Sequence, residues 1–466
     1  MKRRRKYRGI SLGTLLMLVL TLAVCGGCSY VLPKLMGHTD IAFNAGMVFE
    51  VLNLGESVTQ LALSDIPLGV QAALQPTQEA MATLPPASNS QTHQPQQPAV
   101  TAAPAPTVAV TAAPTAVPVR GGTFTMTFGG TVNMGDALRK SGYYSESEKY
   151  DFSEMLSFMA DEMRSDLTLV SLENLVIPDG KVSALIAPAD VMNTLQEIGV
   201  DVLALGFPEG YEKKLEGLAS TIDAANATGM TVIGGYKSQA DRDNLRIVTL
   251  DNVKVALLHY TQTMCSASKS ALKKETSDFA LPLTMQGGEP QEILSDIEKA
   301  RTLGAQVIVV SLNWGTDGKG TPSNDQKELA QQLADAGADV IVGTGTLVVQ
   351  PAAWLTGKNP DGSDKQTLCV YSLGSLLNEL RKDGNVASIL LQLTISCDGN
   401  GKVTFDRTAY TPTYIWRYKQ DSKYYYRVVA SDKEPPDGMS DDQASNKDRA
   451  FENVKKKLAD SPLALR

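Results

Sequence analysis

Residues 307–350 have the sequence VIVVSLNWGTDGKGTPSNDQKELAQQLADAGADVIVGTGTLVVQ, which predicts one strand–loop–helix–strand unit. Apart from Ser311, residues 307–312 are apolar and mostly β-branched, as in a strand that is buried on both faces. The Ser-x-x-Gln pattern at 323–326 is a capping box that starts a helix, and Gly337 ends it. Residues 339–343 form the next buried strand. The loops that follow both strands should therefore meet at one edge of a sheet, where ligands of α/β proteins usually bind.

Strand and helix patterns alternate upstream of this unit. Strands are predicted at 123–128, 167–172 and 202–205, and helices at 152–163, 191–198 and 215–228. Such alternation is typical of an α/β fold. After Tyr371 the pattern changes to strands alone, including a hairpin whose turn is formed by Asp398 to Gly401. Tyr414, Trp416 and Tyr418 follow on one face of an extended segment, and packing against a sheet is favoured over stacking on sugar rings.

The amino terminus has the pattern of a membrane anchor. Six of the first eight residues are basic, and no charged residue occurs from Gly9 to Pro33. This length of apolar chain can cross a bilayer as a helix, and the basic flank places its amino end in the cytoplasm. A cleaved signal peptide with a lipid-attachment site at Cys25 is the alternative. The bulky Val24 before Cys25 favours the uncleaved anchor.

The next part of the chain is predicted to be a disordered stalk. Residues 76–118 contain nine prolines among Ala, Thr, Gln and Val, and Glu79 is the sole charged residue between Asp65 and Arg120. This composition cannot build a core and favours extended conformations. A folded part carried on such a stalk would stand away from the membrane.

Charge and cysteine content exclude other classes. The net charge is −8, and the six basic residues at the amino terminus leave −14 for the remainder, so we expect no nucleic-acid partner. Five cysteines are too few for a disulfide scaffold. Cys265, Cys369 and Cys397 lie outside the predicted anchor, and we interpret them as small buried hydrophobic residues.

Several motifs resemble those of the capsule-synthesis proteins of the CapA type. Trp-Gly-Thr-Asp at 314–317, the helix and strand that follow, and Tyr-Ser-Leu-Gly at 371–374 carry the resemblance, which covers about residues 122–395. Ser-Leu-Glu at 171–173 stands for the family's Asn-Leu-Glu. The resemblance implies a metallophosphoesterase-like α/β/β/α sandwich, preceded here by the transmembrane helix and the stalk. The predicted domains are a cytoplasmic basic segment (1–8), a signal anchor (9–33), a membrane-proximal segment with the stalk (34–120), a CapA-like domain (121–430) and a charged tail (431–466). Within the tail, one terminal helix is predicted from Asp448 to Leu458.

The resemblance also implies a metal centre of His, Asp and Asn side chains, and most of these are missing here. Gly130 stands for the family's first Asp, Asn313 for its His before Trp-Gly, and Gly-Thr-Gly-Thr-Leu at 343–347 for its Gly-His-His-Pro-His. The chain has three histidines, of which only His259 falls within the predicted domain. His259 could supply at most one ligand, and we interpret it instead as a hydrogen-bonded core or rim residue. We therefore assign no metal ligand and expect no cofactor.

Polar residues remain at the predicted strand ends. Glu173 and Asp317 are the candidate catalytic residues, and the candidate binding residues are Asn174, Glu209, Asn313 and Trp314. Their oxygens could hold a hard divalent cation such as Mg²⁺ or Ca²⁺ weakly. A hydrogen-bonded loop cluster that is retained for folding is the alternative interpretation.

These observations predict a membrane-anchored extracytoplasmic protein that takes part in capsule, poly-γ-glutamate or other envelope-polymer synthesis. Its expected role is binding or scaffolding without the family's metal-dependent chemistry. The expected partners are the membrane and an envelope polymer or capsule-synthesis membrane proteins. An active metallophosphoesterase-like hydrolase or polymer-transfer enzyme is the first alternative, and a structural wall-binding protein is the second.

Overall fold

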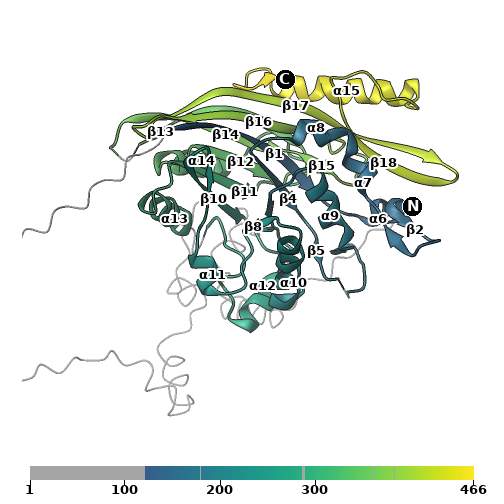
Figure 1. Ribbon diagram of the computed structural model, residues 1–466, viewed down its shortest axis with the longest axis horizontal. Helices are drawn as coiled ribbons and strands as arrows, with labels where there is room; N and C mark the ends of the chain where they lie inside the picture. The colour runs from purple at the N-terminus through teal and green to yellow at the C-terminus, as the bar shows by residue number, and fades with distance from the viewer. Residues whose placement is uncertain (1–120, 179, 286–288, 360, 383) are drawn as a thin grey trace, which may run out of the picture. The chain divides into compact units, whose positions relative to one another are not determined.

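Two large β-sheets dominate the structure, a computed structural model that describes residues 121–178, 180–285, 289–359, 361–382 and 384–466. Figure 1 shows how the helices lie around these sheets. The predicted basic segment, anchor and stalk lie outside these residues. Among the described residues, no helix combines the length and the apolar character needed to cross a membrane. The predicted α/β character is confirmed.

The larger sheet has nine strands in the order β18-β17-β16-β1-β4-β7-β8, with β15 beside β1 and β19 beside β17. Strands β1, β4, β7 and β8 are parallel, whereas the pairs β1–β16, β16–β17 and β17–β18 are antiparallel. The strands are β1 (Gly122–Val132), β4 (Leu167–Leu172), β7 (Val202–Ala204), β8 (Thr231–Ile233), β15 (Ser375–Leu377), β16 (Ala387–Cys397), β17 (Val403–Gln420), β18 (Lys423–Ala430) and β19 (Ala464–Leu465).

The smaller sheet has six strands in the order β13-β14-β12-β11-β10-β9. Its central strands β10, β11, β12 and β14 are parallel. The strands are β9 (Arg246–Leu250), β10 (Val253–Thr261), β11 (Val307–Asn313), β12 (Val340–Thr344), β13 (Val349–Lys358) and β14 (Asp364–Leu373). Two pairs of short strands lie outside both sheets: β2 (Tyr143–Tyr144) pairs with β3 (Lys149–Tyr150), and β5 (Leu175–Val176) pairs with β6 (Ile186–Ala187).

Helices cover the outer faces of the two sheets. Those packed on the larger sheet are α6 (Asp136–Gly142), α7 (Ser153–Leu156), the 3₁₀ turn η1 (Ser157–Met159), α8 (Ala160–Met163), α9 (Asp190–Glu197), α10 (Lys214–Ala227) and α12 (Ser266–Glu275). Against the smaller sheet lie α11 (Gln239–Asp243), α13 (Gln291–Thr302) and α14 (Asn324–Asp335). The last helix, α15 (Asp441–Lys457), does not lie on an outer face, because it packs on β16 and β17 and joins the core between the sheets.

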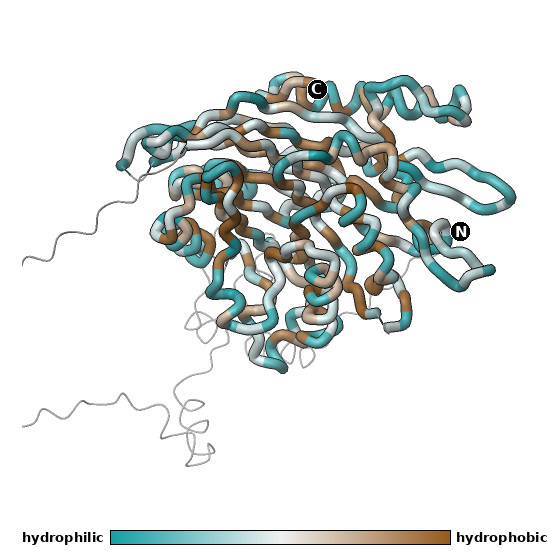
Figure 2. The backbone as a smooth tube through the Cα atoms, in the orientation of Figure 1, coloured by the Kyte–Doolittle hydropathy of each residue, from teal (hydrophilic) through white to brown (hydrophobic). Residues whose placement is uncertain are grey.

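Three hydrophobic cores separate these layers. One lies between the sheets and contains Phe124, Val255, Val309 and Leu391. A second joins the larger sheet to its helices, and a third joins the smaller sheet to α13 and α14. Figure 2 shows the hydrophobic segments along the central strands, while α15 is mainly hydrophilic. The order of layers is therefore helix, sheet, sheet, helix, which is consistent with the predicted metallophosphoesterase-like sandwich.

The unit from β11 to β12 has the predicted form. Ser323 and Gln326 make both hydrogen bonds of the capping box at the start of α14. Leu329 and Leu333 are buried on the face of α14 that packs on the smaller sheet. Because β11 and β12 are parallel neighbours, the loops that follow them share one edge.

Two expectations about local structure are wrong. The helix predicted over 152–163 is divided into α7, η1 and α8, although Met155, Met159 and Met163 still face the core. The Ser157 hydroxyl donates to the Glu154 carbonyl, a local bond that competes with regular helix pairing. The terminal helix begins at Asp441, well before the predicted Asp448, because Ser440 and Gln443 form a second capping box.

The carboxyl-terminal region packs onto the larger sheet. Residues 431–466, predicted as a charged tail, include α15, whose Ala450 and Val454 join the core between the sheets. Tyr414 and Trp416 are buried, which confirms that this aromatic stripe packs against protein. These two rings are therefore not exposed for binding a glycan.

Candidate functional site

The two sheets bring four of the predicted site residues to one edge. Glu173 directly follows β4, and Asn313 is the last residue of β11 in the other sheet. Glu209 and Asp317 lie in the loops after β7 and β11. We name this set, Glu173, Glu209, Asn313 and Asp317, the carboxylate rim. All four side chains follow or end parallel strands, as the sequence predicts.

A hydrogen bond across the sheets holds Glu173. The Asn313 amide nitrogen donates to the Glu173 Oε1 atom at 2.8 Å, and the Thr131 hydroxyl donates to the same oxygen at 3.3 Å. Asn313 and Thr131 are buried, while Glu173 is partly buried. The backbone N–H of Glu173 donates to the Val132 carbonyl at 2.9 Å. The carboxyl group is therefore held between β1, β4 and β11.

The surroundings of Glu173 shift its ionisation. Burial raises the pKa of Glu173 to about 7, the hydrogen bond from Asn313 opposes this rise, and the charges of Asp317 and Glu209 add to it. Glu209 and Asp317 are exposed. Burial also raises the pKa of Glu209, with further contributions from Glu212 and Asp317. The rim therefore combines mutually repelling carboxylates with one carboxyl group that titrates near neutral pH.

The side chains of Asn174 and Trp314 are hydrogen-bonded to backbone groups within the fold. The Asn174 amide oxygen accepts from the Met134 N–H at 2.6 Å, and its amide nitrogen donates to the Ala184 carbonyl at 3.2 Å. The Trp314 indole donates to the Tyr371 carbonyl at 2.8 Å, and the two rings stack with centroids 6.0 Å apart. Both side chains are buried. The structure therefore does not bring these two predicted binding residues to the rim with free polar groups.

His259 is a core residue, as predicted. It is buried in β10, with Nε2 at 2.9 Å from the Gly206 carbonyl and Nδ1 at 2.9 Å from the Ser311 hydroxyl. A carbonyl only accepts hydrogen bonds, so Nε2 carries the proton and Nδ1 accepts from Ser311. Burial lowers the pKa of His259 to about 4. The ring is therefore neutral at pH 7, and both of its nitrogens have protein partners.

The residues present do not fit the metal centre that the family resemblance implies. A Cβ atom at Gly130, where the resemblance places an Asp, would lie 2.2 Å from the Gly374 carbonyl oxygen. Gly345, where it places a His, has a φ of +94°, and a Cβ atom there would lie 2.9 Å from the Asn313 Oδ1 atom. Within the part of the chain that the structure describes, no three His, Cys, Asp or Glu side chains are grouped to hold one metal ion.

Several polar residues near the rim were missed by the sequence analysis. Thr131 binds Glu173, and Gln262 accepts from the Gly315 N–H at 2.6 Å. Cys265 is also not the buried residue that we expected, because it is partly exposed, caps α12 and lies 3.3 Å from Glu212. Cys369 and Cys397 are buried, as predicted. Thr131 could have been found, because it is a polar residue near the end of a predicted strand.

Comparison with known proteins identifies the family. The family model described as "Bacterial capsule synthesis protein PGA_cap" matches residues 125–380. This match covers more than half of the chain, so the protein belongs to that family of bacterial capsule synthesis proteins. The matched region contains β4, β7, β11 and all four rim residues.

Two curated relatives carry related names. The chain is 24% identical over 212 residues to "PGA biosynthesis protein CapA" of Bacillus subtilis (strain 168), covering 45% of this chain and 51% of the relative. It is 27% identical over 194 residues to "Capsule biosynthesis protein CapA" of Bacillus anthracis, covering 41% of this chain and 43% of the relative. The chain thus spans about half of the length of the curated relatives it matches.

Two solved structures show more distant similarity. The NAD nucleotidase NadN of Haemophilus influenzae has a TM-score of 0.37 and 12% identity, over 74% of this chain and 57% of that chain. A hypothetical protein from Thermus thermophilus has a TM-score of 0.33 and 14% identity, over 63% of this chain and 98% of that chain. These scores are too low to assign a shared fold.

Proposed function

We propose that this protein acts in the synthesis of capsule, poly-γ-glutamate or another envelope polymer by binding or scaffolding, without metal-dependent hydrolysis. Family membership and the names of the CapA relatives support the pathway. The proposed absence of metal-dependent hydrolysis rests on the metal-donor groups of the rim, which are three carboxylates and one amide. Such oxygens suit hard, weakly held ions and form a poorer site for activating water than imidazole-rich centres.

Enzyme assays test this proposal. We expect the full-length protein to show no turnover of phosphomonoesters or phosphodiesters above background with added Mg²⁺, Mn²⁺ or Zn²⁺. Glu173→Gln and Asp317→Asn serve as matched variants, because each removes one rim charge with little change of shape. Turnover that either variant reduces by about a hundredfold, with circular dichroism unchanged, would show that these carboxylates are catalytic.

One observation favours a second candidate, a hydrolase or polymer-transfer enzyme. The pKa of about 7 for Glu173 suits a general acid or base at neutral pH. In that case the rate should follow the titration of one group near pH 7, and Glu173→Gln should remove this dependence. The same assays, repeated from pH 5 to pH 9 with a γ-linked glutamate polymer as substrate, separate this candidate from the binding role.

The proposed location is the outer side of the cell membrane, with residues 9–33 as the anchor and the amino terminus in the cytoplasm. The basic flank and the uncharged span in the sequence support this proposal. Protease added to intact cells or protoplasts should cut between Pro76 and Arg120 and release a fragment that contains the described residues. Full protection of this segment in protoplasts would contradict the proposed topology.

A further inference from the structure

A cleft of about 1090 Å³ opens between the two sheets, away from the carboxylate rim. Its lining comes from the residues that precede β11 and β12, from the β13–β14 hairpin and from the turn between β16 and β17. The rim lies at the other end of these parallel strands. The seven residues of β11 span roughly 20 Å, so the cleft and the rim are separate sites. We name this feature the Trp354 cleft.

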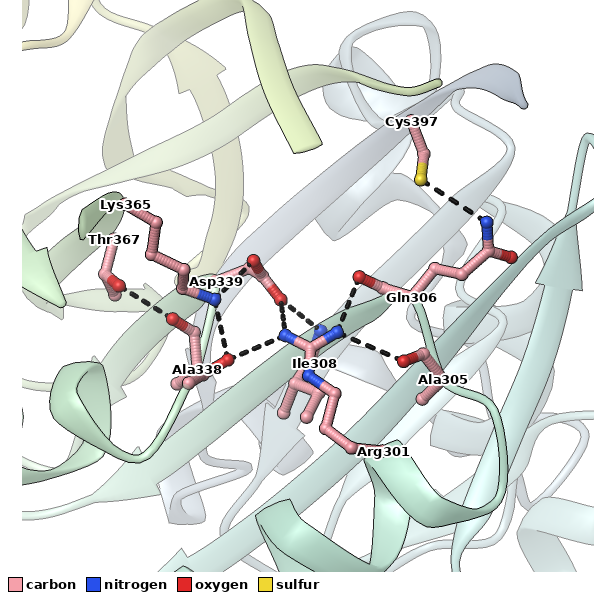
Figure 3. Close-up of polar contacts among 10 residues, drawn as sticks. Arg301, Ala305, Gln306, Ile308, Ala338, Asp339, Lys365, Thr367 and Cys397 are labelled. Atoms are coloured by element: carbon pink, nitrogen blue, oxygen red, sulfur yellow. Dashed lines mark hydrogen bonds and ion pairs between the residues drawn. The ribbon is translucent and has the colours of Figure 1, made fainter. Parts of the chain in front are cut away.

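Arg301, Asp339 and Lys365, which line the floor of the Trp354 cleft, form an ionic cluster in which Asp339 is buried and the two cations are partly buried. Figure 3 shows the contacts of this cluster. Asp339 accepts from the Arg301 guanidinium at 2.7 Å and from the Lys365 ammonium at 2.6 Å. The second nitrogen of that guanidinium donates to the Ala305 and Gln306 carbonyls at 3.1 and 2.7 Å. These contacts hold both cations in place. The floor is therefore preorganised, and its charges are already engaged with each other.

Aromatic rings form one wall of the cleft. Trp354 is 38% exposed, whereas the other two tryptophans of the chain, Trp314 and Trp416, are 2% and 4% exposed. Trp354 lies beside Phe405 of the other sheet, with centroids 5.0 Å apart at an interplanar angle of 61°. Residues two apart on a strand face the same side, so Trp354 shares a face of β13 with Ala352, which belongs to the core between the sheets. Trp354 is therefore at the solvent-exposed edge of that core.

The charges around the cleft are balanced. Three basic and three acidic side chains line it: Arg301, Lys365, Lys402, Asp339, Asp361 and Asp364. Asp364 is paired with Lys358 at 2.5 Å. The remaining lining includes amide side chains such as Gln366 and Asn400. Such a site has no excess charge to attract a polyanion, but it offers an aromatic surface beside hydrogen-bonding groups.

We propose that the Trp354 cleft binds a neutral oligosaccharide, with one pyranose ring against Trp354 and its hydroxyl groups against the amide and charged side chains of the lining. A sugar ring has an apolar C–H face and a polar edge, which match these two kinds of lining. This site is distinct from the carboxylate rim and does not depend on the proposed function. Through this cleft the protein would bind a glycan in addition to the polymer of its proposed pathway.

Tryptophan fluorescence of the full-length protein tests this proposal. The probes are N-acetylglucosamine tetramer and maltotetraose. Because Trp314 and Trp416 are buried, a saturable change in emission and protection from acrylamide quenching should come from Trp354. We expect this response with at least one probe, and we expect it to disappear in Trp354→Phe. Calorimetry should show that Trp354→Ala weakens binding by about tenfold or more.

Tyr424→Ala is the matched control, because Tyr424 is 48% exposed on β18 and does not line the cleft. Its saccharide affinity should equal that of the parent protein. A γ-linked glutamate oligomer should not compete with the saccharide. The proposal is overturned if neither saccharide binds at up to about 10 mM, if Trp354→Ala with unchanged circular dichroism binds as tightly as the parent, or if the glutamate oligomer displaces the saccharide.

Discussion

Glu173 is the residue on which the chemistry of the rim depends. Its carboxyl group accepts from Asn313 and Thr131, and the charges of Asp317 and Glu209 lie close enough to raise its pKa further. At pH 7 the group is therefore present in both protonation states. A protonated Glu173 relieves the repulsion among the rim carboxylates.

Stability should depend on pH through this residue. The pKa of Glu173 is about 7 in the folded protein against 4.5 for an ordinary Glu, so the folded state binds this proton more tightly than the unfolded chain does. This contribution to the free energy of unfolding is largest below pH 4.5, falls between pH 4.5 and pH 7, and is lost above pH 7. Glu173→Gln keeps the neutral form at every pH, so it should stabilise the protein at pH 8 by about 1–3 kcal/mol.

Urea unfolding of the parent and of Glu173→Gln at pH 5 and pH 8 measures this difference. The gap in unfolding free energy should be larger at pH 8. A gap that is the same at both pH values would show that Glu173 titrates normally. Glu154→Gln provides a control, because Glu154 is an exposed carboxylate away from the rim.

Asp339 differs from Glu173, because two cations contact its carboxylate. It is buried and forms ion pairs with both Arg301 and Lys365. Asp339→Asn would leave two cations without their carboxylate, and we expect it to cost about 2–4 kcal/mol of unfolding free energy. Asp335→Asn, on the solvent side of α14, should change the free energy of unfolding by less than about 0.5 kcal/mol. Equal, small effects of both variants would contradict the structural role of Asp339.

At the scale of elements, α14 holds the loop that carries Asp317. Its capping box fixes the start of the helix, and its apolar side packs on β13 and β14. Leu333 has no exposed surface. We expect Leu333→Ala to cost about 2–5 kcal/mol, because it leaves a cavity between the helix and the sheet. Lys327→Ala on the exposed side of the same helix is the control, and a Leu333→Ala effect below about 1 kcal/mol would mean that α14 is not packed as described.

The sequence predicted elements well where local and tertiary preferences agree. The β11–α14–β12 unit has continuous β-branched strands and a full capping box, so its form follows from local chemistry. The failures occur where contacts distant in sequence decide. α15 has only a narrow buried stripe that includes Ala450 and Val454, so hydrophobic periodicity indicated only its second half. The break in the 152–163 helix leaves the apolar spacing unchanged, and spacing alone could not reveal it.

At the scale of the whole molecule, the two sheets define two separate regions. Parallel strands direct Glu173, Glu209, Asn313 and Asp317 to one end, which sequence patterns predicted because strand ends can be recognised locally. The hydrogen bonding of Asn174 and Trp314 within the fold could not be predicted, because their partners are backbone groups of distant segments. The Trp354 cleft was not predicted either, because its lining comes from segments that are distant in sequence and belong to both sheets.

The central claim is that the rim does not form the metal centre of a metallophosphoesterase. Calorimetric titration of the metal-free, full-length protein with Mn²⁺ tests it most directly, with Glu173→Gln titrated in parallel. The carboxylates and the amide should bind no ion more tightly than about 0.1 mM, and Glu173→Gln should change this little. Binding of Mn²⁺ in a whole-number ratio to the chain with a dissociation constant near about 1 μM, lost in Glu173→Gln, would contradict the claim.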